Sequence, residues 1–293
     1  MRIIVVRDSD IAEQLTAELR KRLPEASISV DAELQHFQET DVVVARAPTK
    51  VLLSKVSMRL LIILGHGLDG VPMEETGTAK VIRAMDTSTS LLVSQYVAHE
   101  VIGYYRRFHD YRLQQQEARW NRLPISSIEN FRVGVLGLGK LGQASALCLT
   151  ALGFTVQAWS RNLHLLPGIV TYSDLDNLYS FLKGCSVLIC LLPLTSETQR
   201  ILNLTTLQQL PYGAYLINLG RGELVCESSI LTALDTGLLS HVSMDVFAQE
   251  PLPPNHPFWC HPKITITPHV AGQMFASTKA DTICQILNKH TFY

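Results

Sequence analysis

The segment from Phe131 to Asn162, FRVGVLGLGKLGQASALCLTALGFTVQAWSRN, constrains the fold more than any other stretch of this chain. It contains the pattern G-x-G-x-x-G at Gly137, Gly139 and Gly142, between an apolar run and a helical stretch that ends at Gly153. In such a β-α-β unit the first glycine permits a tight turn, the second lets the backbone approach a pyrophosphate, and the third allows close helix–strand packing. The segment therefore predicts a dinucleotide site with the phosphates at the helix N-terminus.

The end of the second strand in this unit indicates which dinucleotide binds. An NAD site normally has Asp or Glu there, which accepts hydrogen bonds from the ribose hydroxyls. This sequence has Ser160 followed by Arg161. A hydroxyl and a guanidinium suit a 2′-phosphate, because arginine presents a planar fork of donors to phosphate oxygens. The sequence thus favours NADP(H), with NAD(H) possible; a solvated surface arginine is the alternative for Arg161.

Short apolar runs alternate with amphipathic stretches along the whole chain. Strands are predicted in the first part at 2–6, 28–30, 41–46 and 59–65, with a helix at 10–23, and in the second part at 131–137, 154–160, 186–193, 214–220, 241–247 and 263–268. Strands that alternate with helices predict parallel β-α-β units. Nearly continuous apolar runs, as in the second part, are typical of strands covered on both faces.

This pattern predicts an α/β fold with two doubly wound parallel-sheet domains. We expect a Rossmann-type nucleotide domain over residues 89–270 and a smaller, flavodoxin-like substrate domain made of 1–88 and a C-terminal helix within 271–293. One long helix over 90–116, with Gly103 as its weak point, is expected to connect the two blocks.

Composition excludes several other classes of protein. The formal net charge is −1, without the basic excess of nucleic-acid binders, and no apolar run is long enough for a membrane span. The six cysteines are scattered without a C-x-x-C pair. We therefore expect free thiols in a reducing cytoplasm, and neither a disulfide framework nor a metal site.

Polar side chains follow the last predicted strands of the second block. Arg221 lies in GRG after one strand, Asp245 and Glu250 lie in and after the next, and His269 follows the last. Open parallel sheets bind ligands at the carboxyl ends of their strands, so these residues are expected to face the cofactor. A single histidine at a strand end could equally be a structural residue. The presence of Arg221 and Glu250 at neighbouring strand ends makes a chemical role the better interpretation.

These residue types suit the reduction of a 2-keto acid. Hydride must reach the carbonyl carbon while a proton reaches its oxygen, and histidine is a fitting proton donor because it titrates near neutral pH. A carboxylate on its other nitrogen would fix the ring and favour the protonated form. An arginine can bind the substrate carboxylate and polarise the keto oxygen.

The sequence resembles the D-isomer-specific 2-hydroxyacid dehydrogenases, and within them most closely the bacterial glyoxylate/hydroxypyruvate reductase A group. The resemblance runs over nearly the full chain and rests on several blocks in the same order: VGVLGLGKLG, LLPLTSETQRILN, LPYGAYLINLGRGELV, ILTALDTGLL, MDVFAQEPLPPNHPFW and ITPHVAG. The resemblance implies a dimer that uses the long helix near 90–116, and small-molecule 2-keto or 2-hydroxy acids as substrates.

The resemblance also implies a role for each matching residue. Arg221 would bind the substrate, Glu250 would be the acid partner, and His269 would be the acid/base. Asp245 would lie beside the nicotinamide. The other cofactor contacts are expected at Gly137, Gly139, Lys140, Leu141, Gly142, Ser160, Arg161, Leu192, Pro193 and Leu219.

In the first block LGHGLDGV is similar to the family's glycine loop, so the backbone amides of His66 and Gly67 would hold the substrate carboxylate. His66 is bulky where the family usually has a small residue, and would narrow the pocket or bond the substrate. VVVARAPTKV is more similar to the phosphoglycerate dehydrogenase branch, which makes Arg46 either a second anion contact or a solvated strand end.

We therefore expect NADPH-dependent reduction of glyoxylate, hydroxypyruvate or a similar short 2-keto acid in a cleft between two domains, with the proton from His269. Two other functions remain open at this point. One is an NAD-dependent 2-hydroxyacid dehydrogenase of the phosphoglycerate type. The other is a dinucleotide sensor without enzymatic activity, against which an intact set of Arg221, Glu250 and His269 argues.

Overall fold

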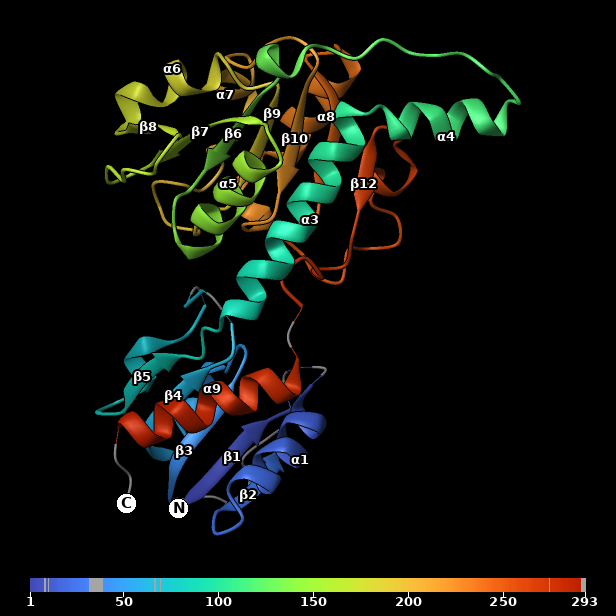
Figure 1. The fold of residues 1–293 in the computed structure, drawn as a ribbon. Helices are drawn as coiled ribbons and strands as arrows, with labels where there is room; N and C mark the ends of the chain where they lie inside the picture. The colour runs from blue at the N-terminus through green and yellow to red at the C-terminus, as the bar shows by residue number, and fades with distance from the viewer. Residues whose placement is uncertain are drawn as a thin grey trace. The chain divides into compact units, whose positions relative to one another are not determined.

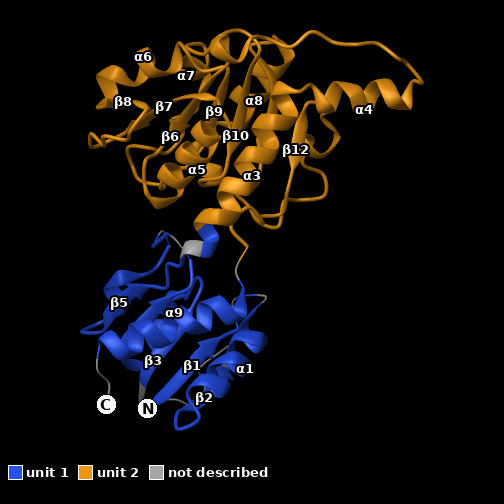
Figure 2. Ribbon diagram, in the orientation of Figure 1, with its two compact units in different colours: residues 1–89, 274–293 blue, residues 90–273 orange. Residues whose placement is uncertain are grey.

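The computed structural model describes residues 1–7, 9, 11–31, 39–65, 67–68, 70–273 and 275–290. The chain divides into two compact units, residues 1–89 with 274–293 and residues 90–273 (Figure 2). Each unit contains one parallel sheet with helices packed against it (Figure 1). The predicted fold class is therefore confirmed. Within the described residues, no helix has both the length and the apolarity that crossing a bilayer requires.

The first unit contains a five-stranded sheet in the order β2-β1-β3-β4-β5. Its strands and helices are β1 (Arg2–Val6), α1 (Ala12–Arg22), β2 (Ser27–Asp31), β3 (Glu39–Ala45), α2 (Lys50–Leu53), β4 (Ser57–Ile63), β5 (Lys80–Arg83) and α9 (Ala276–Lys289). Ile3 and Val5 pack with α1 and α9, whereas Ile4 and Val6 belong to the core on the other face. Alternate residues of β1 thus contribute to the cores on opposite faces of the sheet.

The second unit contains a seven-stranded sheet in the order β12-β11-β10-β9-β6-β7-β8. Its elements are α3 (Thr87–Tyr105, which begins in the first unit), α4 (Phe108–Gln116), β6 (Arg132–Leu136), α5 (Lys140–Ala151), β7 (Thr155–Ser160), β8 (Val170–Ser173), α6 (Leu178–Leu182), β9 (Val187–Cys190), α7 (Leu204–Leu207), β10 (Ala214–Asn218), α8 (Glu227–Asp235), β11 (Leu239–Met244) and β12 (Ile264–Ile266). Short 3₁₀ helices η1–η5 lie at Met73–Glu75, Ile128–Asn130, Leu175–Asn177, Gly222–Leu224 and Pro257–Cys260.

Each face of this second sheet has its own core. One face packs against α3 and α5, through residues such as Val97 and Leu149. The other face packs against α6 and α8, through residues such as Phe181 and Ile230. The order of the strands reverses between β6 and β9, which is the place where doubly wound sheets bind ligands.

The expected single helix over 90–116 is wrong in one respect. The helix does not weaken at Gly103, which is buried inside α3; it breaks three residues later, between α3 and α4. Arg107 adopts a left-handed backbone with φ 60°, and its guanidinium donates to Asp110 Oδ2 at 2.6 Å. This local ion pair at the start of α4 accompanies the turn.

Candidate active site

The glycine loop follows β6 at the reversal of strand order and leads into α5, whose N-cap is Gly139. Gly137 has φ 109°, and a Cβ on it would lie 2.8 Å from the carbonyl oxygen of Leu191. A Cβ on Gly142 would lie 1.8 Å from the Gly137 oxygen. The space at Gly139 is open, because a Cβ there would meet no atom within 4 Å. Two glycines are thus required by packing, while the third leaves backbone accessible to a phosphate.

The residues at the start of α5 leave the loop open to solvent. Gly139 and Lys140 are exposed, and Leu141 is half-buried against the core under α3 and α5. The first N–H groups of α5 have no partners within the helix and carry the positive end of its dipole. The loop therefore fits the pyrophosphate of a dinucleotide.

At the end of β7, Ser160 and Arg161 differ in their surroundings. The Ser160 side chain is buried and its hydroxyl donates to the carbonyl oxygen of Asn162 at 2.7 Å. The Arg161 side chain is 77% exposed, with its Nη1 3.9 Å from the Glu197 carboxylate. A pair so exposed is weak because water and salt screen it. Arg161 is therefore available to an anion from solvent.

The ends of the next strands place the remaining predicted residues along one edge of the sheet. Leu192, which is buried, and the exposed Pro193 follow β9. Leu219 and Arg221 follow β10, and Asp245 follows β11. These strands are adjacent and parallel, so their carboxyl ends lie at the same edge, next to the glycine loop.

His269 and Glu250 form the pair that the sequence suggested. The Nδ1 of His269 lies 2.8 Å from Glu250 Oε2, and both side chains are about one-third exposed, at 34% and 36%. The other oxygen of Glu250 accepts the backbone N–H of Phe247 at 3.0 Å. With Nδ1 donating to a carboxylate, the Nε2 atom remains for proton exchange with a substrate.

Asp245 is buried, at 1% exposure, and holds the backbone around His269. Its Oδ1 accepts from the Val270 N–H at 2.8 Å, and its Oδ2 accepts from the Ala271 N–H at 3.0 Å. Its carbonyl oxygen accepts from the His269 N–H at 2.9 Å, where His269 has φ 55°. The left-handed conformation of His269 is thus stabilised by hydrogen bonds on either side.

Arg221 lies between β10 and η4 with a half-buried side chain. Its Nη1 donates to the Gly220 carbonyl oxygen at 2.7 Å. Gly222, the next residue, has no room for a side chain, because a Cβ there would lie 2.0 Å from the Ala248 nitrogen. Close packing therefore requires glycine at position 222, independently of any role of Arg221.

The first unit contributes the predicted substrate residues Arg46, at the end of β3, and Gly67, in the loop after β4. Both are half-buried. His66 lies outside the described residues. The carboxyl ends of adjacent β3 and β4 thus carry these two positions at one edge of the first sheet.

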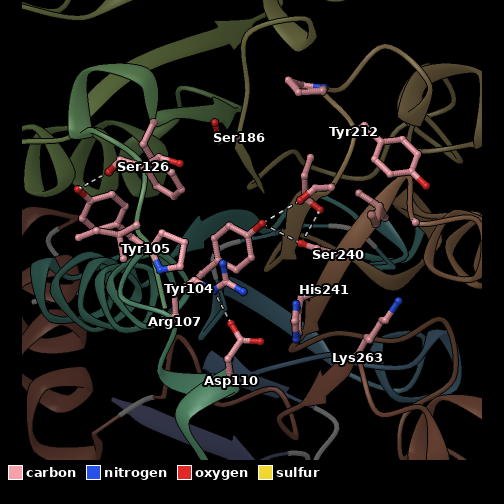
Figure 3. A pocket seen from close by; sticks show the side chains of 18 residues that line it. Tyr104, Tyr105, Arg107, Asp110, Ser126, Ser186, Tyr212, Ser240, His241 and Lys263 are labelled. Carbon is pink, nitrogen blue, oxygen red and sulfur yellow. Dashed lines mark hydrogen bonds and ion pairs between the residues drawn. The ribbon is translucent and has the colours of Figure 1, made fainter. Parts of the chain in front are cut away.

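A pocket of about 550 Å³ lies at the opposite end of the second sheet (Figure 3). Its lining includes Ser186, Ala214, Leu239 and Lys263, each of which stands just before or at the start of a strand. Tyr104 reaches into this region from α3 and bonds the Ser240 hydroxyl at 2.8 Å. The pocket is therefore separate from the carboxyl-end residues described above.

Thr267 was not predicted as a site residue, yet its hydroxyl donates to Asp245 Oδ1 at 2.6 Å. Its position two residues before His269, just after β12, could have indicated that it belongs to the site. Tyr96, which bonds Thr267 from α3, carried no such signal, because the contact joins residues 171 positions apart in the chain.

Comparisons with known proteins give one consistent result. The family model described as D-isomer specific 2-hydroxyacid dehydrogenase, NAD binding domain, matches residues 99–271. Glyoxylate/hydroxypyruvate reductase A of Yersinia enterocolitica is 36% identical over 290 residues, covering 97% of this chain and 93% of the relative. That protein and this chain therefore correspond over nearly their full lengths.

Solved structures of the same family are similar to this chain over nearly its full length. A D-isomer specific 2-hydroxyacid dehydrogenase from Xanthobacter autotrophicus Py2, in complex with NADPH and MES, superposes with a TM-score of 0.90 at 29% identity, covering 98% of this chain and 94% of that one. An NADPH-dependent glyoxylate/hydroxypyruvate reductase from Sinorhizobium meliloti, in complex with NADP and sulfate, gives 0.88 at 28% identity, covering 99% and 93%.

Proposed function

The chain belongs to the D-isomer-specific 2-hydroxyacid dehydrogenase family and is an NAD(P)-dependent oxidoreductase; we propose that it reduces short 2-keto acids, glyoxylate or hydroxypyruvate, with NADPH. The observation that carries the proposal is the pair of His269 and Glu250, 2.8 Å apart at the end of the sheet that carries the glycine loop. A histidine so oriented can deliver a proton to a carbonyl oxygen. The similarity to reductases of these two substrates supports the substrate class.

The proposed roles divide the reaction among a few side chains. A bound nicotinamide supplies the hydride for the carbonyl carbon. His269 donates a proton from Nε2 to the keto oxygen, and Glu250 holds Nδ1 and stabilises the charged ring. Arg221 binds the substrate carboxylate and polarises the keto oxygen. From the first unit, we propose Arg46 and the backbone at His66 and Gly67 as further contacts to the substrate anion.

The proposed cofactor contacts follow from the fit of the loop. Gly137, Gly139, Lys140, Leu141 and Gly142 would hold the pyrophosphate at the start of α5. Leu192, Pro193, Leu219 and Asp245 would lie along the nicotinamide half.

A preference for NADPH is supported by the residues after β7. Ser160 and Arg161 stand where an NAD enzyme carries an acid, and the Arg161 side chain is 77% exposed. Two solved relatives were crystallised with NADPH or NADP. We propose Arg161 as the main contact to the 2′-phosphate.

We further propose that residues 1–88 with 271–293 bind substrate, that 89–270 bind the dinucleotide, and that the enzyme is a cytoplasmic homodimer. Large exposed apolar side chains on α4 and the chain that follows, at Phe108, Leu113, Trp120 and Ile125, support the dimer, since an interface would remove their surface from water.

The test is turnover of a panel of 2-keto acids, including glyoxylate, hydroxypyruvate and phosphohydroxypyruvate, with NADPH and NADH at equal concentrations. The proposal expects the highest kcat/KM for glyoxylate or hydroxypyruvate with NADPH. A preference for NADH and the phosphorylated acid would instead assign the phosphoglycerate type. Tight cofactor binding without turnover of any acid would assign a sensor.

A further inference from the structure

The segment Thr267–Ala271, which carries His269, is organised around the Asp245 carboxylate. Three donors reach its two oxygens: the Thr267 hydroxyl and the Val270 N–H at Oδ1, and the Ala271 N–H at Oδ2. The Asp245 carbonyl oxygen accepts the His269 N–H. The orientation of this one buried carboxylate therefore determines the backbone on both sides of His269.

A second layer of hydroxyls continues from Asp245 towards α3. The Tyr96 hydroxyl lies 2.8 Å from Thr267 Oγ1 and 3.1 Å from Ser243 Oγ. The carboxylate can only accept, so the single proton of Thr267 goes to Asp245. Thr267 must then accept from Tyr96, whose single proton is used in this bond. The charge of Asp245 thus fixes the direction of the two bonds that lead from Tyr96 through Thr267 to the carboxylate.

Burial keeps the proton on Tyr96, and packing holds α3 against the sheet. Tyr215 donates to Glu100, which also lies on α3 and is 5% exposed. Burial raises the pKa of Tyr96 and of Tyr215, so both hydroxyls keep their protons across the working range of pH. Tyr96 itself is anchored because α3 packs against the sheet through Val93 and Val97.

We propose that Tyr96 is a positioning residue of the reaction: through Thr267 and Asp245 it fixes the segment 267–271 and so the ring of His269. The inference rests on the proposed role of His269 as proton donor. Displacement of a catalytic group by about 1 Å can cost 10²-fold in rate, so a distant hydroxyl can affect kcat without touching substrate.

The test uses Tyr96→Phe and Thr267→Val, which remove the two hydroxyls while keeping most of the side-chain volume. Thr267→Ser is the rescue variant because it restores the hydroxyl. Tyr104→Phe is the matched control: Tyr104 lies about two turns further along α3 and bonds Ser240 of the same strand, but at the opposite end of the sheet. All four are made in the full chain.

Three measurements are made on each variant. Steady-state kinetics with NADPH gives kcat and KM, and fluorescence titration gives the Kd of NADPH. Hydrogen–deuterium exchange follows the amides of Val270 and Ala271, which does not depend on turnover. We expect kcat to fall roughly tenfold in Tyr96→Phe and up to about 100-fold in Thr267→Val, with both KM and Kd within about twofold. Exchange at the two amides accelerates in both variants, and Thr267→Ser and Tyr104→Phe behave as wild type.

Normal kcat and normal exchange in Tyr96→Phe would overturn the inference, and so would an equal loss in Tyr104→Phe. Should Thr267→Val fail to fold, Tyr96→Phe decides alone. If the wild type turns over no keto acid, the proposed function fails, whereas the exchange result still decides whether Tyr96 holds this segment.

Discussion

At the residue scale, the proposed proton transfer depends on two hydrogen bonds that Glu250 accepts, one from His269 Nδ1 and one from the Phe247 N–H. The second bond ties the carboxylate to the backbone after β11 and so fixes the position of the acceptor for His269 Nδ1. The two residues have different proposed roles, proton donor and orienting acid, and their replacement should have different effects.

Replacing His269 by Ala removes the proton donor and should lower kcat by about 10²–10⁴-fold. Glu250→Gln keeps an acceptor for Phe247 but loses the negative charge, so we expect a smaller loss. NADPH affinity, measured by fluorescence titration, should stay near wild type in both. A His269→Ala variant with normal turnover would contradict the role assigned to His269.

Arg161 belongs to the proposed cofactor site, so its replacement should change KM for NADPH. A charge-assisted hydrogen bond is worth about 1.5–3 kcal/mol, so Arg161→Ala should raise KM for NADPH roughly 10- to 100-fold and leave KM for NADH unchanged. Glu197→Gln removes the only carboxylate paired with this guanidinium within the described residues, and should tighten NADPH slightly at low salt. Equal effects on both cofactors would exclude a contact to the 2′-phosphate.

At the scale of elements, the sequence predicted those strands that have a clear hydrophobic pattern. Central strands such as β6 and β10 are continuous apolar runs, buried on both faces, and were recognised with correct type and near-correct ends. The edge strands β5 and β8 were missed, because half-exposed residues such as those of β8 lack that signal. The break at Arg107 was missed as well, since a left-handed arginine has no sequence signature.

The same limit applies to the candidate site. Residues at strand ends, such as His269 and Glu250, were predictable because parallel topology brings strand ends to one edge. The bond of Tyr96 to Thr267 was not, because it depends on how α3 rotates against the sheet. Packing decides such rotations, and no local pattern records them.

The helix α9 is fastened to the first unit by a buried ion pair. Lys279 is 0% exposed; its Nζ lies 2.6 Å from Asp86 Oδ2 and donates to the Ala84 carbonyl oxygen at 2.7 Å. Lys279→Met leaves the Asp86 carboxylate without its counter-ion and should destabilise the protein by about 3–5 kcal/mol. The double variant Asp86→Asn/Lys279→Met should recover part of this loss in urea unfolding, which measures the coupling.

This pair also predicts a pH dependence. Burial alone would raise the pKa of Asp86, but hydrogen bonds from Lys279, Ser88 and Thr89 outweigh it and lower the pKa from 3.8 to about 2. The stabilisation is therefore complete above about pH 4 and is lost as the pH falls towards 2. Asp86→Asn should flatten the pH dependence of the unfolding free energy in this interval. A profile identical to wild type would exclude Asp86 as its source.

At the scale of the whole molecule, α4 and the chain that follows it are the candidate dimer surface. Phe108 and Leu113 on α4 are 48% and 56% exposed, and Trp120 and Ile125 on the chain that follows are 103% and 49% exposed. From Glu117 to Ser127 this chain forms neither helix nor strand (Figure 1). Leaving such side chains in water is unfavourable by about 25 cal/mol per Å² of apolar surface. A second copy of the chain would cover them.

We therefore predict that Leu113→Asp/Trp120→Asp converts the proposed homodimer into a monomer, because two buried carboxylates without partners would be added to each side of the interface. Val51→Asp, at a 64% exposed apolar position of α2 in the first unit, is the control and should remain dimeric. Sedimentation velocity at several concentrations gives the state of each protein. If the double variant keeps the wild-type sedimentation coefficient, contacts elsewhere hold the assembly; if wild type is already a monomer, these side chains face water in the native enzyme.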